Sequence, residues 1–265
     1  MEVYVLASGS KGNITYLKSN NFKLLVDAGI SYQRIKQKFI EYNEDLNVID
    51  GLFLTHEHQD HIYGLKMLLK KVKIRNIFLT KGTYNGLAGD IRELIKNPVF
   101  IKSDEEFVFN GIKVLPFMLS HDANEPVGFL FTYNDKKIVH LTDTGYVDMS
   151  YYSVLEDADF YLLEANHNPT KLMSSPRPYA LKQRIISEKG HLSNEDASWL
   201  MNRLIKNKKA IWVVAHMSED CNSIEDVEET IIEAFDDPTK VEVYYASQEG
   251  LAVIKVWLKL LQSGN

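Results

Sequence analysis

Four side chains that can bind metal ions lie within six positions of this sequence, in the run His56-Glu57-His58-Gln59-Asp60-His61. The chain has only eight histidines, so chance rarely brings three of them this close. On extended backbone His56 and His58 point to the same side, while Asp60 and His61 follow a turn and reach a neighbouring point. The alternative is a polar turn that happens to be rich in histidine. The spacing favours two adjacent metal sites.

The composition bounds the class of protein. With 265 residues, 45% of them hydrophobic, the chain can bury a large core. It lacks Gly/Ser-rich, Pro-rich or highly charged linkers, which predicts a single domain over residues 1–265. The net charge of −6 does not indicate nucleic-acid binding. It does not exclude a phosphate substrate either, because bound metal would bring local positive charge.

The sequence also bears on the compartment. The single cysteine, Cys221, excludes an intramolecular disulfide and is typical of a reducing environment. The first residues run into strand-like sequence without a basic region and apolar signal core. No apolar run approaches the roughly 18 residues that span a bilayer. We therefore expect a cytoplasmic protein without membrane contact.

Short apolar runs bounded by Gly, Asn or Asp predict strands. They cover residues 3–7, 24–27, 52–55, 77–80, 112–117, 128–133, 137–142, 159–164, 210–215, 241–245 and 251–256. Helical periodicity predicts helices over 31–42, 61–72 and 83–96, and capping residues predict two more after Ser193 and Ser223. Several strands follow one another through short turns, which disfavours simple βαβ repetition. We predict an α/β fold, a four-layer αββα sandwich.

Three single residues share one context with the opening run. His121, Asp143 and His216 each follow an apolar strand and precede polar turn residues. A lone histidine after a strand is more often a surface residue, but strand ends are where a scaffold presents functional side chains. Together with the run at 56–61, they are candidate metal ligands.

This arrangement resembles the metallo-β-lactamase fold, in which a histidine–aspartate cluster and later single His, Asp and His residues build a two-metal site. Within that superfamily, further motifs resemble the YycJ (WalJ) type of small nuclease and, more distantly, RNase Z. These motifs are Leu6-Ala7-Ser8-Gly9-Ser10-Lys11-Gly12-Asn13, Val26-Asp27-Ala28-Gly29, Leu163-Glu164-Ala165-Asn166-His167 and Lys189-Gly190-His191-Leu192-Ser193-Asn194-Glu195-Asp196-Ala197.

The resemblance implies two sets of metal ligands that share Asp143. The first set is His56, His58, His121 and Asp143, and the second is Asp60, His61, Asp143 and His216. Imidazole and carboxylate ligands suit two Zn²⁺ ions, and Mn²⁺ or Fe²⁺ would also be accepted. A water that bridges two such cations loses its proton near neutral pH and becomes the nucleophile.

The resemblance also implies the catalytic residues. Asp60 would orient the attacking hydroxide as well as bind metal. His191 would protonate the leaving group or bind the scissile phosphate, with Glu164 holding its other ring nitrogen; the alternative for Glu164 is a surface carboxylate at a strand end. Asp27 would support the histidine loop. His167 is open between site lining and structure.

Two further residues have plain alternatives. His140 lies inside an apolar strand, where a buried core histidine is the usual outcome. Cys221 follows His216 by five positions and could be a soft metal ligand, although a free thiol is more common.

The superfamily spans several hydrolytic reactions, so the substrate needs separate evidence. The complete second ligand set favours phosphodiesters. Residues 168–190 carry five basic side chains and one acidic one, and predict either a phosphate-facing lid on which Tyr179 stacks a base, or a solvated basic loop. We expect a metal-dependent phosphodiesterase, in the first place a DNA exonuclease of the YycJ type.

Two other activities stay open. One is a cyclic-nucleotide phosphodiesterase of the anti-Pycsar type, which a chain with Asn168-Pro169 in place of an expected acidic residue allows. Since enzymes of that type are dimeric, a homodimer is one assembly that the sequence permits. The other is a glyoxalase-type thioester hydrolase, which uses much the same ligands. The expected partner is therefore a nucleic acid or a cyclic nucleotide.

Overall fold

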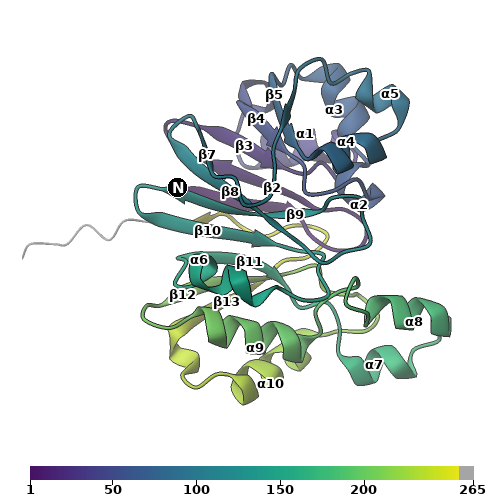
Figure 1. Cartoon of the computed structure of the whole chain (residues 1–265), viewed down its shortest axis with the longest axis vertical. Helices are drawn as coiled ribbons and strands as arrows, with labels where there is room; N and C mark the ends of the chain where they lie inside the picture. Colours follow the sequence, from purple (N-terminus) through teal and green to yellow (C-terminus); the bar gives the residue numbers. More distant parts are fainter. Residues whose placement is uncertain (257–265) are drawn as a thin grey trace, which may run out of the picture.

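Two mixed β-sheets pack face to face in the computed structural model of the chain, which describes residues 1–256 (Figure 1). Within these residues each sheet has seven strands. In spatial order the first sheet contains β14 (Ile254–Lys255), β1 (Glu2–Ala7), β2 (Ile14–Lys18), β3 (Lys23–Val26), β4 (Gly51–Phe53), β5 (Asn76–Leu79) and β6 (Pro98–Phe100). The second contains β13 (Val241–Tyr245), β12 (Ala210–Ala215), β11 (Phe160–Glu164), β10 (Lys136–Leu141), β9 (Val127–Tyr133), β8 (Ile112–Met118) and β7 (Phe107–Phe109).

Both sheets follow the same plan. Strands β1, β2 and β3 pair antiparallel and β3 to β6 pair parallel, while β7 to β10 pair antiparallel and β10 to β13 pair parallel. Parallel neighbours end at the same edge of a sheet. The residues that follow β3, β4, β10, β11 and β12 therefore come out at the edges where the two sheets meet.

Helices cover both outer faces (Figure 1). Those of the first half are α1 (Tyr32–Glu41), α2 (Gln59–Ile62), α3 (Leu65–Lys71), α4 (Lys81–Gly86) and α5 (Gly89–Arg92). Those of the second half are α6 (Tyr152–Leu155), α7 (Pro169–Ser174), α8 (Tyr179–Ile185), α9 (Asn194–Leu204) and α10 (Ile224–Ala234). Short 3₁₀ turns span Leu46–Val48, Met149–Tyr151 and Pro238–Lys240. The four-layer α/β sandwich predicted from the sequence is confirmed.

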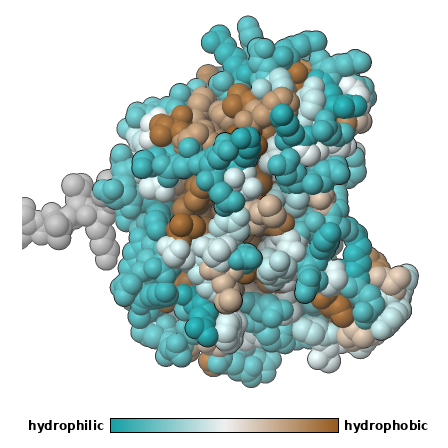
Figure 2. Space-filling model, in the orientation of Figure 1, coloured by the Kyte–Doolittle hydropathy of each residue, from teal (hydrophilic) through white to brown (hydrophobic). Residues whose placement is uncertain are grey.

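Aromatic residues fill the layer between the sheets. The ring of Phe53 in β4 stacks on Phe78 at 4.4 Å and meets Phe129 and Phe131 of the opposite sheet edge-on at 5.4 and 5.5 Å. Each of these side chains is buried, and burying one phenylalanine contributes about 1.5–3 kcal/mol. Separate apolar clusters join the outer faces to the helices. The surface that Figure 2 shows is mostly hydrophilic, with hydrophobic side chains in limited patches.

Two predicted helices are each interrupted. The helix expected over 61–72 is split into α2 and α3, because Gly64 packs so closely against Ile30 that a Cβ atom there would lie 2.0 Å from the Ile30 carbonyl oxygen. The helix expected over 83–96 is split into α4 and α5, where extended backbone at Leu87 turns this side chain into the core. Periodicity along the chain does not reveal such tertiary contacts.

Segment 168–190, expected as a lid or a basic loop, contains helices α7 and α8. Pro169 occupies the first turn of α7 and Pro178 precedes α8, positions at which proline costs no helical hydrogen bond. In Figure 1 the two helices project as a lobe beside α9 and α10. No helix within residues 1–256 is both long enough and apolar enough to cross a membrane. The single domain over 1–265 stays a prediction, and its last part, 257–265, lies outside the described residues.

His140 in β10 makes the stability of the core depend on pH. It is 5% exposed, its Nδ1 has no hydrogen-bond partner, and burial lowers its pKa to about 4. The folded protein therefore keeps the ring neutral, while the unfolded chain takes up a proton below about pH 6.5. The stability that the folded protein gains by keeping His140 neutral is complete above pH 6.5. It is lost as the pH falls toward 4.

We predict that His140→Leu removes this pH dependence. Between pH 7.5 and 5.5 the native chain should lose about 1.4 kcal/mol more unfolding free energy than the variant. Urea unfolding at both pH values, with a chelator present so that metal binding does not contribute, measures the difference. Equal losses in the two proteins would contradict the prediction.

Candidate metal centre

His56 and His58 lie between β4 and α2, and Asp60 and His61 belong to α2. His58 precedes the first turn of α2, and the amide of His61 donates to its carbonyl oxygen at 2.9 Å. His56 and His58 come together with His121, which follows β8, so that one ring nitrogen of each lies within 4.8 Å of the others. Three imidazoles thus converge from two loops.

Two histidines of this first group are kept neutral by burial. His56 is fully buried, its Nε2 has no hydrogen-bond partner, and burial lowers its pKa well below the ordinary value. Burial also lowers the pKa of His121, whose Nδ1 lies 3.2 Å from the carbonyl oxygen of Gly190. A neutral imidazole with one nitrogen held by the protein is the form that binds divalent metals. The second nitrogen of His56 is free, while that of His121 lies 3.2 Å from His58 Nδ1.

A second group contains Asp60, His61, Asp143 and His216. The Nε2 of His61 lies 2.9 Å from Asp143 Oδ2, and the Nε2 of His216 lies 3.4 Å from both Asp143 Oδ1 and Asp60 Oδ2. Asp143 Oδ2 is buried and has no well-aligned hydrogen-bond donor. The four side chains come from α2 and from the ends of β10 and β12, so the two halves of the chain contribute to one cluster.

The charges of this group attract a cation. Burial alone would lower the pKa of His216, but Asp143, Asp60 and Glu164 raise it to about 9. Burial likewise opposes protonation of His61, and the same aspartates together with Asp27 raise its pKa well above the ordinary value. The field that favours protons on these rings equally favours a divalent cation in their place, so the donor set fits a metal.

A third group joins Asp143 and His216 to Glu164 and His191. Glu164, the last residue of β11, is fully buried; its Oε2 lies 3.0 Å from His191 Nδ1 and its Oε1 accepts the amide of Thr144 at 2.7 Å. The His191 side chain is 17% exposed. The carboxylate therefore holds one ring nitrogen and leaves the other available.

Three of these strand-end residues adopt left-handed backbone. The φ angles are 61° at Asp27, 61° at Asp143 and 50° at His216. This region is unfavourable for residues other than glycine, and such strain is concentrated at functional sites. At each of the three positions the chain leaves a strand and turns sharply, which directs the side chain into the centre. Nothing in the sequence distinguishes these turns from ordinary strand ends.

Asp27 occupies the position expected of a support for the histidine loop. It follows β3 and is 1% exposed. Its Oδ1 accepts the amide of Thr55 at 2.9 Å, while its Oδ2 accepts the Thr55 hydroxyl at 2.8 Å and lies 2.7 Å from His61 Nδ1. The Thr55 hydroxyl also lies 3.0 Å from His56 Nδ1. One carboxylate therefore orients both histidine rings, directly or through Thr55.

Two asparagines reach the centre without having been assigned a role from the sequence. The amide nitrogen of Asn13 lies 3.2 Å from His61 Nε2 and 3.3 Å from Asp60 Oδ2. The amide of Asn166 lies 3.1 Å from His216 Nδ1. Both residues belong to the motifs from which the family resemblance was drawn. Their place in these motifs was the one sign in the sequence that they contribute to the site.

An ion pair at the rim was also missed. Asp122 lies 3.4 Å from His121 Nε2 and 3.8 Å from His58 Nε2, and it receives Arg184 of α8 through both carboxylate oxygens. This contact connects the projecting lobe to the first group of candidate ligands.

Three other candidates lie apart from the metal-binding groups of the described residues. His140 is buried in β10, as expected of a core histidine. His167 is 2% exposed, and its backbone pairs with Ser193 in an isolated bridge. Cys221 is fully buried against Leu172 and Ile185, beneath α7 and α8.

Comparisons with known proteins agree with this geometry. A family model described as a beta-lactamase superfamily domain matches residues 23–217. The exodeoxyribonuclease WalJ of Streptococcus pneumoniae serotype 2 is 37% identical over 223 residues, which cover 82% of each chain. The exodeoxyribonuclease YycJ of Bacillus anthracis is 36% identical over 226 residues, which cover 82% of this chain and 83% of that protein.

A solved structure shares the fold. The metallo-β-lactamase fold protein YhfI of Bacillus subtilis superposes with a TM-score of 0.71, over 96% of this chain and 99% of that chain, at 15% sequence identity. At this identity the similarity concerns the fold alone.

The contacts of Asp27 generate a prediction for metal affinity. In Asp27→Asn the amide presents hydrogens toward His61 Nδ1, so the ring loses its acceptor and its fixed orientation. We expect metal affinity to fall about 10–100-fold, the usual cost of removing such a supporting group. Competition with a chromogenic chelator measures it. Asp50→Asn is the matched control, since Asp50 accepts the amide at the other end of β3, from Lys23, and should leave metal affinity unchanged; a similar loss in both variants would contradict the prediction.

Proposed function

This chain belongs to the metallo-β-lactamase superfamily, and on that premise we propose that it is a metal-dependent exodeoxyribonuclease. The observation that carries the proposal is the convergence of two metal-binding groups with a carboxylate-held histidine in one centre. Relatives named exodeoxyribonucleases match over more than four fifths of both chains, which supports DNA as the substrate.

Two divalent metal ions are proposed as cofactors. His56, His58 and His121 would hold one ion, and Asp60, His61 and His216 the other, with Asp143 lying between them. In the structure Asp143 groups with the second and third clusters rather than with the three imidazoles, so its share in the first site is part of the proposal. When bound, the two ions would lower the pKa of a water molecule and offset the charge on the attacked phosphoryl group. Zn²⁺ suits these ligands, and Mn²⁺ is the alternative.

The protein's own contribution is to position donors and move a proton. Glu164 holds Nδ1 of His191 and leaves Nε2 available, from which the ring would protonate the leaving oxygen. Asp60 would bind metal and orient the nucleophile through the same carboxylate. The Thr144 amide donates to the second oxygen of Glu164, so this carboxylate cannot rotate freely. It therefore holds the His191 ring in a fixed orientation.

A first prediction separates the roles of the residues. His191→Ala should lower kcat roughly 10²–10⁴-fold, the usual contribution of a general acid, while the protein still binds two metal ions per chain. Asp60→Ala should abolish activity and lower metal content as well. Single-turnover rates together with elemental analysis measure both quantities. Loss of metal from His191→Ala would overturn its assignment as a proton donor.

A second prediction concerns the substrate. The metal-loaded protein should degrade 5′-phosphorylated DNA in preference to precursor tRNA and to cyclic mononucleotides, assayed side by side. Affinity for DNA should fall steeply as salt rises, because several phosphates are neutralised on binding. A preference for cyclic mononucleotides with a shallow salt dependence would instead identify a cyclic-nucleotide phosphodiesterase, and turnover of a glutathione thioester would identify a glyoxalase-type enzyme.

A further inference from the structure

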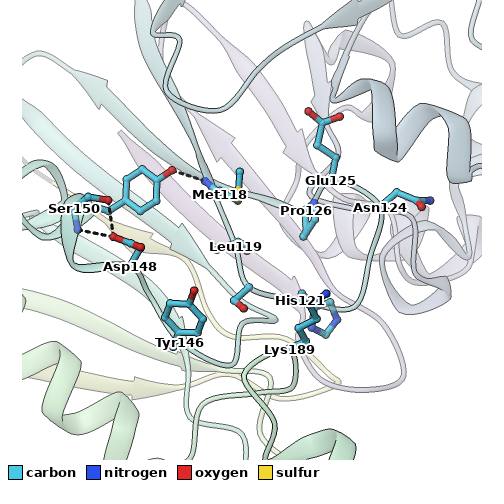
Figure 3. A pocket seen from close by; sticks show the side chains of 12 residues that line it. Met118, Leu119, His121, Asn124, Glu125, Pro126, Tyr146, Asp148, Ser150 and Lys189 are labelled. Atoms are coloured by element: carbon cyan, nitrogen blue, oxygen red, sulfur yellow. Dashed lines mark hydrogen bonds between the residues drawn. The ribbon is translucent and has the colours of Figure 1, made fainter.

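A cavity of about 380 Å³ opens beside His121, which forms part of its lining. Its size lies in the range of about 300–1,000 Å³ that is typical of small-molecule sites. Figure 3 shows Tyr146, Asp148 and Ser150 on one side and His121 with Lys189 on the other. The apolar part of the lining comes from Met118, Leu119 and Pro126. A ligand at the metal-binding groups would therefore extend directly into this space.

The walls of the cavity are fixed by backbone contacts. The Thr144 hydroxyl donates to the Tyr146 carbonyl oxygen at 2.6 Å and accepts the Ser120 amide at 3.0 Å, while Gly145 donates to the Ser120 carbonyl oxygen at 2.9 Å. Gly145 also packs so tightly that a Cβ atom would lie 2.2 Å from the carbonyl oxygen of Glu188. This packing sets the position of the next residue, Lys189, at the mouth of the cavity.

Lys189 differs from the other basic residues of the lobe. Lys171 pairs with Asp226, Arg177 with Asp220 and Arg184 with Asp122, and Lys182 donates to the Met173 carbonyl oxygen. In the described part of the chain the ammonium group of Lys189 makes no ion pair or hydrogen bond. The backbone beside it is held to the centre, because Gly190 accepts from His121. The backbone next to a metal-ligand candidate is thus held in place, and the unpaired ammonium group of Lys189 extends from it.

Two carboxylates also line the cavity and keep their negative charge, so an anion is favoured only beside Lys189, away from Glu125 and Asp148 (Figure 3). Glu125 accepts the amide of Gly82 at 2.6 Å, and Asp148 accepts the amide and hydroxyl of Ser150 at 2.8 and 2.7 Å. Tyr146 is 47% exposed and presents its ring to the opening. Tyr179, which the sequence had suggested for base stacking, is 68% exposed on α8 and does not line this cavity.

We propose that this cavity binds the terminal nucleotide of a DNA strand, with the base against Tyr146 and Met118 and a phosphate on Lys189. The proposal rests on the proposed nuclease function and names its nucleotide site. An apolar wall with an aromatic ring accepts a base without sequence preference. A lysine at the rim supplies one phosphate contact. Together they would hold one nucleotide beside the metal-binding groups.

The test measures binding separately from cleavage. The metal-loaded protein is titrated by calorimetry with deoxyadenosine, with its 5′- and 3′-monophosphates and with inorganic phosphate; the mononucleotides carry no internucleotide bond to cleave. The native protein should bind the preferred monophosphate more tightly than either fragment. Lys189→Gln should weaken that binding roughly tenfold, as expected for a hydrogen bond to a charged group, and leave deoxyadenosine binding unchanged.

Variants of Tyr146 test the contact with the base. Tyr146→Ala should weaken both the monophosphate and deoxyadenosine about tenfold, within the range measured for base–aromatic stacking, while Tyr146→Phe should resemble the native protein. Lys102→Gln, which removes an exposed lysine paired with Glu105 outside the cavity, is the charge-matched control.

The outcomes distinguish this inference from the function on which it rests. If Lys189→Gln and Tyr146→Ala bind the monophosphate as the native protein does while DNA is degraded, the nucleotide site lies elsewhere and the nuclease proposal stands. If the variants weaken monophosphate binding as expected but the native protein degrades no DNA, the nucleotide site stands and the exonuclease proposal fails. A parallel loss in Lys102→Gln would overturn the assignment of Lys189.

Discussion

The buried carboxylate of Asp27 is the contact on which the centre depends. It joins the end of β3 to Thr55 after β4 and to His61 in α2, so three separate segments meet at one side chain. Because these polar groups are buried, removing the carboxylate would leave them without partners, which costs more than an ordinary hydrogen bond contributes. The strained backbone at Asp27 is sustained by these contacts. The same device, a polar side chain after a strand in left-handed backbone, recurs at Asp143 and His216.

Much of this arrangement could be predicted from the sequence because its causes are local. Alternating apolar runs mark most of the strands, and Ser193 and Ser223 do cap α9 and α10 through the amides of Asp196 and Asp226. Ligand-type residues that follow apolar strands end at one edge of the sandwich for topological reasons. The helix breaks at Gly64 and Leu87 were not predicted, because they result from packing against Ile30 and against the core. These contacts are far from either residue in sequence.

The charge of the folded surface was the property that the sequence predicted least well. Residues 168–190 look strongly basic in sequence, but three of their cations are paired with aspartates that lie 43 or more positions away, as in the contacts of Arg177 with Asp220 and Arg184 with Asp122. A count of charges along the chain therefore overstates what the folded surface offers to a phosphate. The electrostatic character of the site comes from the few groups that folding leaves unpaired.

The distribution of the ligands along the chain has a consequence for synthesis. His56 to His61 come from the first quarter of the sequence, and His216 follows β12 near its end. Since metal ligands that are far apart in sequence are brought together only by folding, a nascent chain that has not yet released β12 cannot assemble the second group. A hydrolytic centre built across two halves in this way is inactive throughout most of translation, and forms only when β12 joins its sheet.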